Sequence, residues 1–145
     1  TIYPHTKMGS QRMVEIARAN LARTGARARL LRADVQALPY VDAAFDGIVN
    51  TMALSGYPDA RRALDEMHRV LRPDGRLVLI DVGFPTDRNR LGTLLARGWQ
   101  STGDLVRDSH SLLEGAGFTV RETMAVGGCG SVQLFIAERP PRTAA

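Results

Sequence analysis

The stretch Arg76-Leu77-Val78-Leu79-Ile80-Asp81-Val82 decides the fold, because it is a nearly continuous apolar run of strand length. A strand with one face in water alternates apolar and polar residues, whereas a strand covered on both faces is apolar throughout. The carboxylate of Asp81 stands near the end of the run. The stretch therefore predicts a strand that is covered on both faces, with a polar group at its carboxyl end.

The residues before this run supply further strands and helices in alternation. Four apolar residues at helical spacing (Ala60, Leu64, Met67 and Leu71) predict a helix over 58–71, closed by the turn Pro73-Asp74-Gly75. A strand is expected at 47–50, and another at 28–33. A helix is expected from Ser10 to Thr24, capped by Ser10 and stopped at Gly25. This order of elements is typical of an α/β sheet with parallel strands.

The residues after the run predict a different ending. A short helix is expected within 84–100, and a clearer one over 104–116. Two strands at 118–126 and 132–138 are joined by a short connection that contains Gly127-Gly128-Cys129-Gly130. So short a connection cannot cross over a sheet, and the last two strands must form an antiparallel hairpin.

The composition narrows the class of protein. The 145 residues are 44% hydrophobic and 23% charged, which fits one ordinary domain. No apolar run approaches the roughly 20 residues that span a bilayer, and the first residues carry no targeting signal, so we expect a cytoplasmic protein with no membrane span. The single Cys129 offers neither a disulfide nor a metal site.

The net charge of +4 and the pI of 10.0 come from one part of the chain. Residues 1–40 hold seven basic side chains and two acidic ones, around one helix and the strand after it. Arginine outnumbers lysine 18 to 1, and aromatic residues are not interleaved with the charges. We interpret this surface as a solvated face and expect no nucleic-acid partner.

Polar residues stand where each predicted strand ends, which is where parallel sheets bind ligands. Asp34 follows the first strand, Asn50 and Thr51 follow the second, and Asp81 ends the third. Each of these positions taken alone also suits a turn or cap residue.

Two motifs at fixed spacing carry a family resemblance. They are Asp34-Val-Gln-Ala-Leu-Pro-Tyr40 and Arg69-Val-Leu-Arg-Pro-Asp-Gly-Arg-Leu77. With the segments around them, over about residues 8–139, they resemble the class I S-adenosylmethionine-dependent methyltransferases, in the branch of quinone-biosynthesis and phospholipid N-methyltransferases. The resemblance implies an α/β, Rossmann-like and mostly parallel sheet with a terminal antiparallel hairpin.

The resemblance also implies roles for residues. Asp34 matches the carboxylate that receives the adenine amine of S-adenosylmethionine, and Val35 donates its backbone amide and packs beside the ring. Asn50 and Thr51 match the segment that lines the methionine portion. Met13 matches a position near the adenosine, and it suits the helix core equally well. The family builds its acceptor pocket where this sequence has Tyr57, Phe84 and Trp99, with His110 as a candidate base.

The sequence departs from the family pattern at its beginning. Family members start with a strand and a G-x-G-x-G cofactor loop, and this sequence has neither. Met8 stands where the family has the acidic residue for the ribose. Gly127 to Gly130 are better explained as hairpin residues than as a displaced cofactor loop. We therefore expect an N-terminally truncated methyltransferase-like domain over 1–139 and a flexible tail over 140–145.

Two hypotheses of function follow. The first is S-adenosylmethionine-dependent methyl transfer to an unidentified small-molecule or lipid-like acceptor. The alternative is a non-catalytic remnant or partner subunit that acts through protein–protein pairing, for example as a homodimer through an exposed sheet edge. A nicotinamide-dependent dehydrogenase is disfavoured, because it also needs an N-terminal glycine loop and gives no reason for the hairpin.

Overall fold

The computed structural model describes residues 2–3, 10–25, 28–85, 90–101 and 106–141. The chain divides into two compact units, Thr1–Pro39 and Tyr40–Ala145. Residues 142–145 of the predicted 140–145 tail lie outside the described residues.

The first unit holds one helix and two short strands. Helix α1 runs over Ser10–Thr24, as predicted, and Gly25 ends it with a φ of 67°, in the left-handed region that glycine adopts freely. Strand β1 (Ile2–Tyr3) pairs in parallel with β2 (Leu31–Arg32). The strand expected at 28–33 is thus shorter than predicted, and β1 was not predicted.

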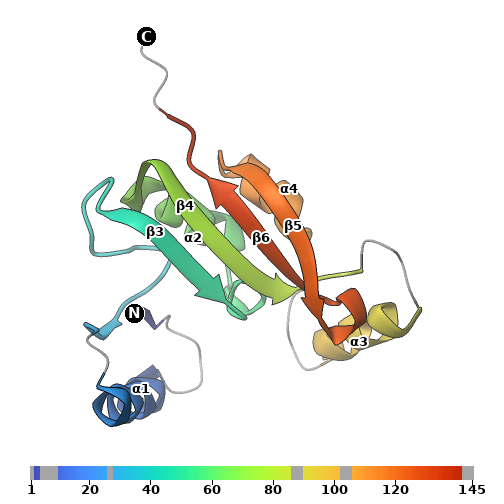
Figure 1. Ribbon diagram of the computed structural model, residues 1–145, viewed down its shortest axis with the longest axis horizontal. Helices are drawn as coiled ribbons and strands as arrows, with labels where there is room; N and C mark the ends of the chain where they lie inside the picture. The colour runs from blue at the N-terminus through green and yellow to red at the C-terminus, as the bar shows by residue number, and fades with distance from the viewer. Residues whose placement is uncertain (1, 4–9, 26–27, 86–89, 102–105, 142–145) are drawn as a thin grey trace. The chain divides into compact units, whose positions relative to one another are not determined.

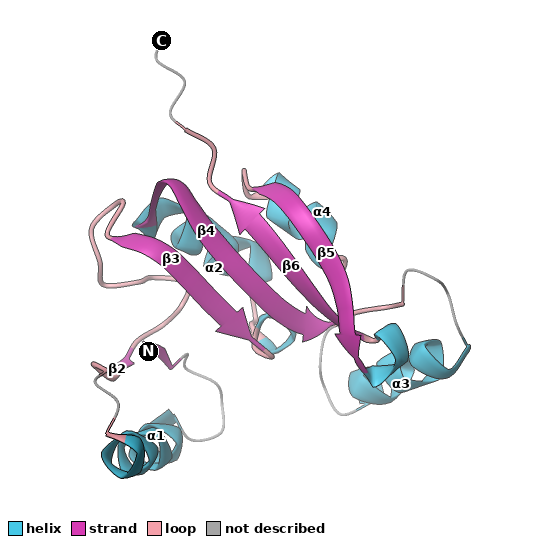
Figure 2. Ribbon diagram, in the orientation of Figure 1, coloured by secondary structure: helices cyan, strands magenta, loops and turns pink. Residues whose placement is uncertain are grey.

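The second unit is built on a four-stranded sheet (Figure 2). Its strands are β3 (Phe45–Thr51), β4 (Leu71–Val82), β5 (Thr119–Gly127) and β6 (Val132–Glu138), in the spatial order β3-β4-β6-β5. Strands β3 and β4 are parallel, and β6 is antiparallel to both β4 and β5. The mixed α/β fold with a terminal antiparallel hairpin is therefore confirmed.

Strand β4 is longer than predicted. It begins at Leu71 and not at Arg76, so the expected turn 73–75 is a kink inside the strand, with Asp74 at a φ of 60°. The backbone N–H of Asp74 donates to the carbonyl of Arg139, and that of Arg139 donates to Gly75. These bonds to the chain beyond β6 extend the ladder through the kink.

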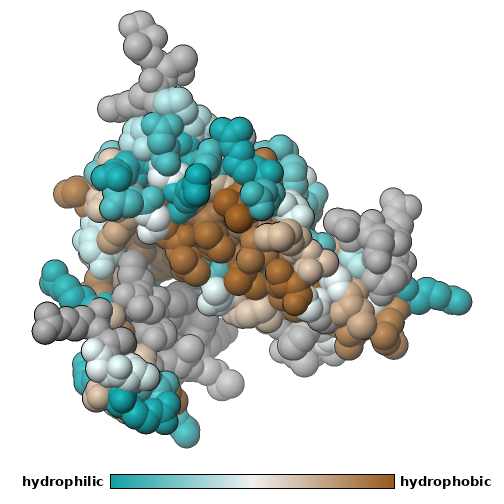
Figure 3. All heavy atoms as spheres, in the orientation of Figure 1, coloured by the Kyte–Doolittle hydropathy of each residue, from teal (hydrophilic) through white to brown (hydrophobic). Residues whose placement is uncertain are grey.

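The side chains of β4 alternate between the two faces of the sheet. Leu77 and Leu79 are fully buried, whereas Val78 and Ile80 are partly exposed. Apolar side chains also gather over the face turned to the viewer in Figure 3. Strand β4 therefore carries aliphatic side chains on both faces of the sheet, which accounts for its continuous apolar run.

Helices α2 (Ala60–Val70) and α4 (Ser109–Gly115) lie against the same face of the sheet (Figure 1). The side chain of Asp59 caps α2 by accepting from the backbone of Arg62 at 3.0 Å. Asp108 caps α4 in the same way through Ser111, so this helix begins at Ser109 and not at 104. Helix α3 (Arg90–Ser101) confirms the short helix expected within 84–100.

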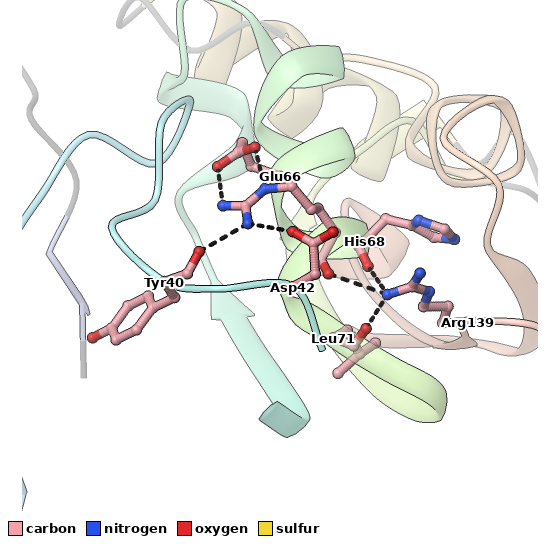
Figure 4. Close-up of polar contacts among 7 residues, drawn as sticks. Tyr40, Asp42, Glu66, His68, Leu71 and Arg139 are labelled. Carbon is pink, nitrogen blue, oxygen red and sulfur yellow. Dashed lines mark hydrogen bonds and ion pairs between the residues drawn. The ribbon is translucent and has the colours of Figure 1, made fainter. Parts of the chain in front are cut away.

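Two arginines tie the end of α2 to distant parts of the unit (Figure 4). Arg69 forms ion pairs with Glu66 and Asp42 and donates to the carbonyl of Tyr40 at 2.8 Å. The guanidinium of Arg139 donates to the carbonyls of His68, Arg69 and Leu71. Those carbonyls lie at the carboxyl end of the helix, where a cation is favoured.

None of the helices in the described part of the chain is long and apolar enough to cross a membrane.

Candidate functional site

The carboxyl ends of β3 and β4 carry a buried polar group built around Asn50. Asn50 is 6% exposed, and its Nδ2 donates to the hydroxyl of Tyr57 at 3.0 Å. Its Oδ1 is a buried oxygen with no hydrogen-bond partner among the described residues. A buried acceptor of this kind carries a desolvation cost that a donor would relieve. The structure thus brings two of the predicted site residues, Asn50 and Tyr57, into direct contact.

The hydroxyl of Tyr57 stays protonated in this environment. Burial raises the pKa of Tyr57 to about 12, the Asn50 hydrogen bond partly opposes this, and the charge of Asp81 adds to it. A phenol with so high a pKa is neutral at physiological pH and can serve as a donor or an acceptor.

The turn after β3 leads from Thr51 to Tyr57 through the short 3-10 helix η1 (Leu54–Gly56). Thr51 is exposed at the end of the strand. Met52 follows it at a φ of 50°, with its side chain 49% exposed. Such a backbone conformation in a residue other than glycine occurs where the surroundings enforce it, and it is frequent at ligand sites.

The carboxylate of Asp81 anchors this turn from the neighbouring strand. Asp81 is 1% exposed, and its Oδ2 accepts from the backbone N–H of Ser55 at 2.8 Å. The position of Asp81 at a strand end pointed to a ligand contact, but its carboxylate is instead bonded within the protein.

The first unit contains the second group of predicted site residues. The Oδ1 of Asp34 accepts from the backbone N–H of Gln36 at 2.9 Å, and the Asp34 carbonyl accepts from Ala37 at 3.1 Å. This turn follows β2 directly and leaves Asp34 exposed, while the Val35 side chain is buried. The exposed, oriented carboxylate beside a buried aliphatic residue suits an aromatic ring that carries an amine.

Four further residues were predicted to belong to the site, and the structure describes the side chains of two of them. Phe84 follows β4 and is 45% exposed, as expected of a residue that could meet a ligand. His110 lies on an exposed part of α4, with Nδ1 at 3.5 Å from Glu114 Oε2. Met13 lies in α1 and Trp99 in α3, but their side chains are outside the described residues. The roles of these four residues stay predictions.

A surface hollow of about 490 Å³ lies in the first unit between the end of α1 and the chain that leads into β2. Its lining residues are Arg18, Leu21, Ala22, Gly25, Ala28 and Leu30. None of the predicted site residues lines it, so the hollow does not support the predicted site.

Sequence reasoning missed one residue that contacts the turn after β3. Arg107 precedes α4 and donates to the carbonyls of Leu54 and Tyr57. It lies some fifty residues further along the chain, and no motif marks it. Only the folded structure reveals this contact.

The comparisons with known proteins agree with this fold. Residues 9–79 match the sequence model of the family described as Methyltransferase domain. The crystal structure of the [4+2]-cyclase SpnF superimposes with a TM-score of 0.72 at 20% identity, over 91% of this chain and 64% of that one. A likeness at this identity shows the fold alone, and the same fold serves more than one chemistry.

The sequence relatives are more specific. The demethylmenaquinone methyltransferase of Thermus thermophilus is 41% identical over 73 residues, which are 50% of this chain and 32% of the relative. The ubiquinone/menaquinone biosynthesis C-methyltransferase UbiE of Geotalea uraniireducens is 32% identical over 78 residues, which are 52% and 33% of the two chains.

These matches bear out the resemblance to the class I S-adenosylmethionine-dependent methyltransferases: residues 9–79 match a methyltransferase family model, and the similar relatives are methyltransferases of quinone biosynthesis. The matched region spans about a third of the length of these curated relatives.

Proposed function

We propose that this chain takes part in S-adenosylmethionine-dependent methyl transfer to a ring carbon of a quinone-type acceptor. The observation that carries the proposal is the 41% identity to a demethylmenaquinone methyltransferase over 73 residues. The match of the family model over residues 9–79, which include Asp34, Asn50 and Thr51, supports it. The same relatives favour this function over a non-catalytic remnant, because their names describe enzymes. Quinone acceptors are also small and lipid-like, as the first hypothesis requires.

Each unit, taken by itself, holds residues whose chemistry fits one polar group of the cofactor. Asp34 is exposed and oriented by its own turn, so its carboxylate would accept from the adenine amine. In the second unit, the buried Oδ1 of Asn50 is an acceptor with no hydrogen-bond partner among the described residues, and an ammonium group of the cofactor would supply the missing donor. When bound, S-adenosylmethionine supplies an activated methyl group on a sulfonium.

The methyl acceptor would meet apolar side chains. Met52 and Phe84 expose large apolar side chains after β3 and β4, where they would cover the ring of a quinol and exclude water. Transfer of a methyl group depends mainly on positioning and desolvation, and a base is needed only to remove the ring proton. His110 stays the candidate for that base.

The test is calorimetric titration with S-adenosylhomocysteine. The chain should bind it, and Asp34→Ala should weaken binding by about tenfold, since a charge-assisted hydrogen bond is lost. Asp65→Ala is the matched control, because Asp65 forms an exposed ion pair with Arg61 on α2 and is not one of the predicted site residues. If the unaltered chain gives no heat at millimolar ligand, or if Asp34→Ala binds as tightly as the control, the proposal is wrong.

The acceptor class needs a separate measurement. The chain is incubated with S-adenosylmethionine and either a naphthoquinol with a free ring position or a phospholipid with a primary amine head group. We expect a mass increase of one methyl group on the quinol only. Methylation of the phospholipid alone would exclude the quinone class.

A further inference from the structure

Arg107 crosses from the segment before α4 to the turn that follows β3. Its Nη1 donates to the carbonyl of Leu54 at 3.1 Å, and its Nη2 donates to the carbonyl of Tyr57 at 2.9 Å. The side chain is partly buried. A planar guanidinium that bonds two carbonyls fixes their separation as well as their position, which a single ammonium does less well.

The opposite side of the turn is held by a carboxylate. The buried Asp81 accepts from the backbone N–H of Ser55, one of the two residues between the carbonyls that Arg107 contacts. The turn therefore meets a cation through its carbonyls and an anion through its N–H. Both charges act on neutral backbone groups, and such charge-assisted bonds are stronger than bonds between neutral groups.

The held turn sets the position of the site residues. Tyr57 ends it, and the Tyr57 hydroxyl accepts from the amide of Asn50. Met52 begins it in a left-handed conformation, with its N–H bonded to the carbonyl of Ile80 at 2.7 Å. A strained turn that is held at several points keeps one conformation, which a site needs before its ligand arrives.

We propose that Arg107 is a positioning residue of the methyltransferase site, which acts by holding the turn after β3 and, through Tyr57, the amide of Asn50. The proposal rests on the proposed function and extends it beyond the region that matches the family model, because residue 107 lies outside residues 9–79. It connects the part of the chain after α3 to the cofactor side of the sheet.

The first test measures the turn itself by amide hydrogen exchange. Arg107→Gln should speed exchange at Ser55, Gly56 and Tyr57 by about tenfold, because two charge-assisted bonds are lost. Arg107→Lys should give an intermediate rate. Arg61→Gln is the control, since Arg61 pairs only with the exposed Asp65 among the contacts described. An unchanged rate in Arg107→Gln, or an equal increase across β4 and β6, would overturn the proposal.

The second test measures ligand binding below the unfolding transition of every variant. We expect Arg107→Gln to raise the dissociation constant of S-adenosylhomocysteine about tenfold, with partial rescue in Arg107→Lys and no change in Arg61→Gln. A merely structural arginine would lower the melting temperature and leave this constant unchanged. If Arg107→Gln does not fold, the dissociation constants of Arg107→Lys and Arg61→Gln are compared instead. A weaker binding in Arg107→Lys alone supports the positioning role, and equal constants contradict it.

The two proposals fail in different ways. If the unaltered chain does not bind S-adenosylhomocysteine, the proposed function is wrong and the positioning role falls with it, whatever the exchange rates show. If the unaltered chain binds and Arg107→Gln binds equally well with a loosened turn, the proposed function stands and the positioning role is wrong.

Discussion

At the scale of single residues, the contact between Tyr57 and Asn50 shows how burial controls chemistry. The ring of Tyr57 is 4% exposed, and its hydroxyl is placed against an amide and near the charge of Asp81. The same environment that raises the pKa of the phenol also makes the pair sensitive to the loss of either partner, because neither has water to replace it.

Tyr57→Phe should lower the free energy of unfolding by about 1 to 3 kcal/mol, because the Asn50 amide keeps only a weak contact with the sulfur of Met67. Tyr40→Phe is the control, since its ring keeps its edge contact with Phe45. Urea unfolding at neutral pH measures both variants. Equal stability of the two would contradict the expectation.

The pKa of Tyr57 also predicts a pH dependence. The folded state holds the phenolic proton to about pH 12, whereas the unfolded state releases it near 10.0. The stabilisation is complete below pH 10 and is lost as the pH rises toward 12, at a cost on the order of 2 kcal/mol. Unfolding experiments across this range should show the loss in the unaltered chain and a smaller slope in Tyr57→Phe.

At the scale of elements, backbone geometry decides where glycine is required. A Cβ on Gly75 in β4 would lie 2.7 Å from Leu71 Cγ and 2.8 Å from the carbonyl of Arg72, whereas a Cβ on Gly98 in α3 meets nothing within 4 Å. Gly75 thus allows the backbone of β4 to lie close to Leu71 and Arg72, where a methyl group has no room. Gly98 has no such role and only weakens helix α3.

Gly75→Ala should destabilise the protein by about 1 to 3 kcal/mol, because the kink in β4 has no room for a methyl group. Gly98→Ala should stabilise it by roughly 0.5 to 1 kcal/mol, since alanine is the better helix former. Thermal unfolding measures both changes against the unaltered chain. A stable Gly75→Ala protein would show that the kink relaxes readily.

At the scale of the whole molecule, the second unit is organised around β4 and β6. Each of these strands has a bonded neighbour on both sides, whereas β3 and β5 each have one within the described sheet. Their buried side chains include Leu77, Leu79 and Phe135. The stability of this unit is therefore expected to be highest at its centre and to decrease outward.

Native-state hydrogen exchange should show the slowest amides in β4 and β6, at pairs such as Ile80 and Leu134. Amides of β5 should exchange faster, because this strand is largely exposed. If β3 exchanges more slowly than β4, some other part of the protein covers its outer edge, and the expectation fails.

Much of the fold could be predicted from the sequence, because the spacing of apolar residues and the residues that end a helix or form a turn are local features of the chain. The stripe of α2, the bounds of α1 and the antiparallel hairpin were all predicted from apolar spacing and short connections. The beginning of α4 was not, since Asp108 competes with earlier residues for the cap and only the folded chain selects it. The extension of β4 to Leu71 depends on bonds to Arg139, which is distant in sequence.

The sequence by itself predicted the class of protein, through the two motifs that carry the resemblance, and the polar residues at the strand ends, because both are patterns of residues that are near one another in the chain. Only the tertiary structure decided that Asn50 and Tyr57 bond to each other, and that Asp81 and Arg107 hold the turn between them. Such contacts join segments up to about fifty residues apart, and a local pattern carries no information about which distant side chain will reach a given backbone group.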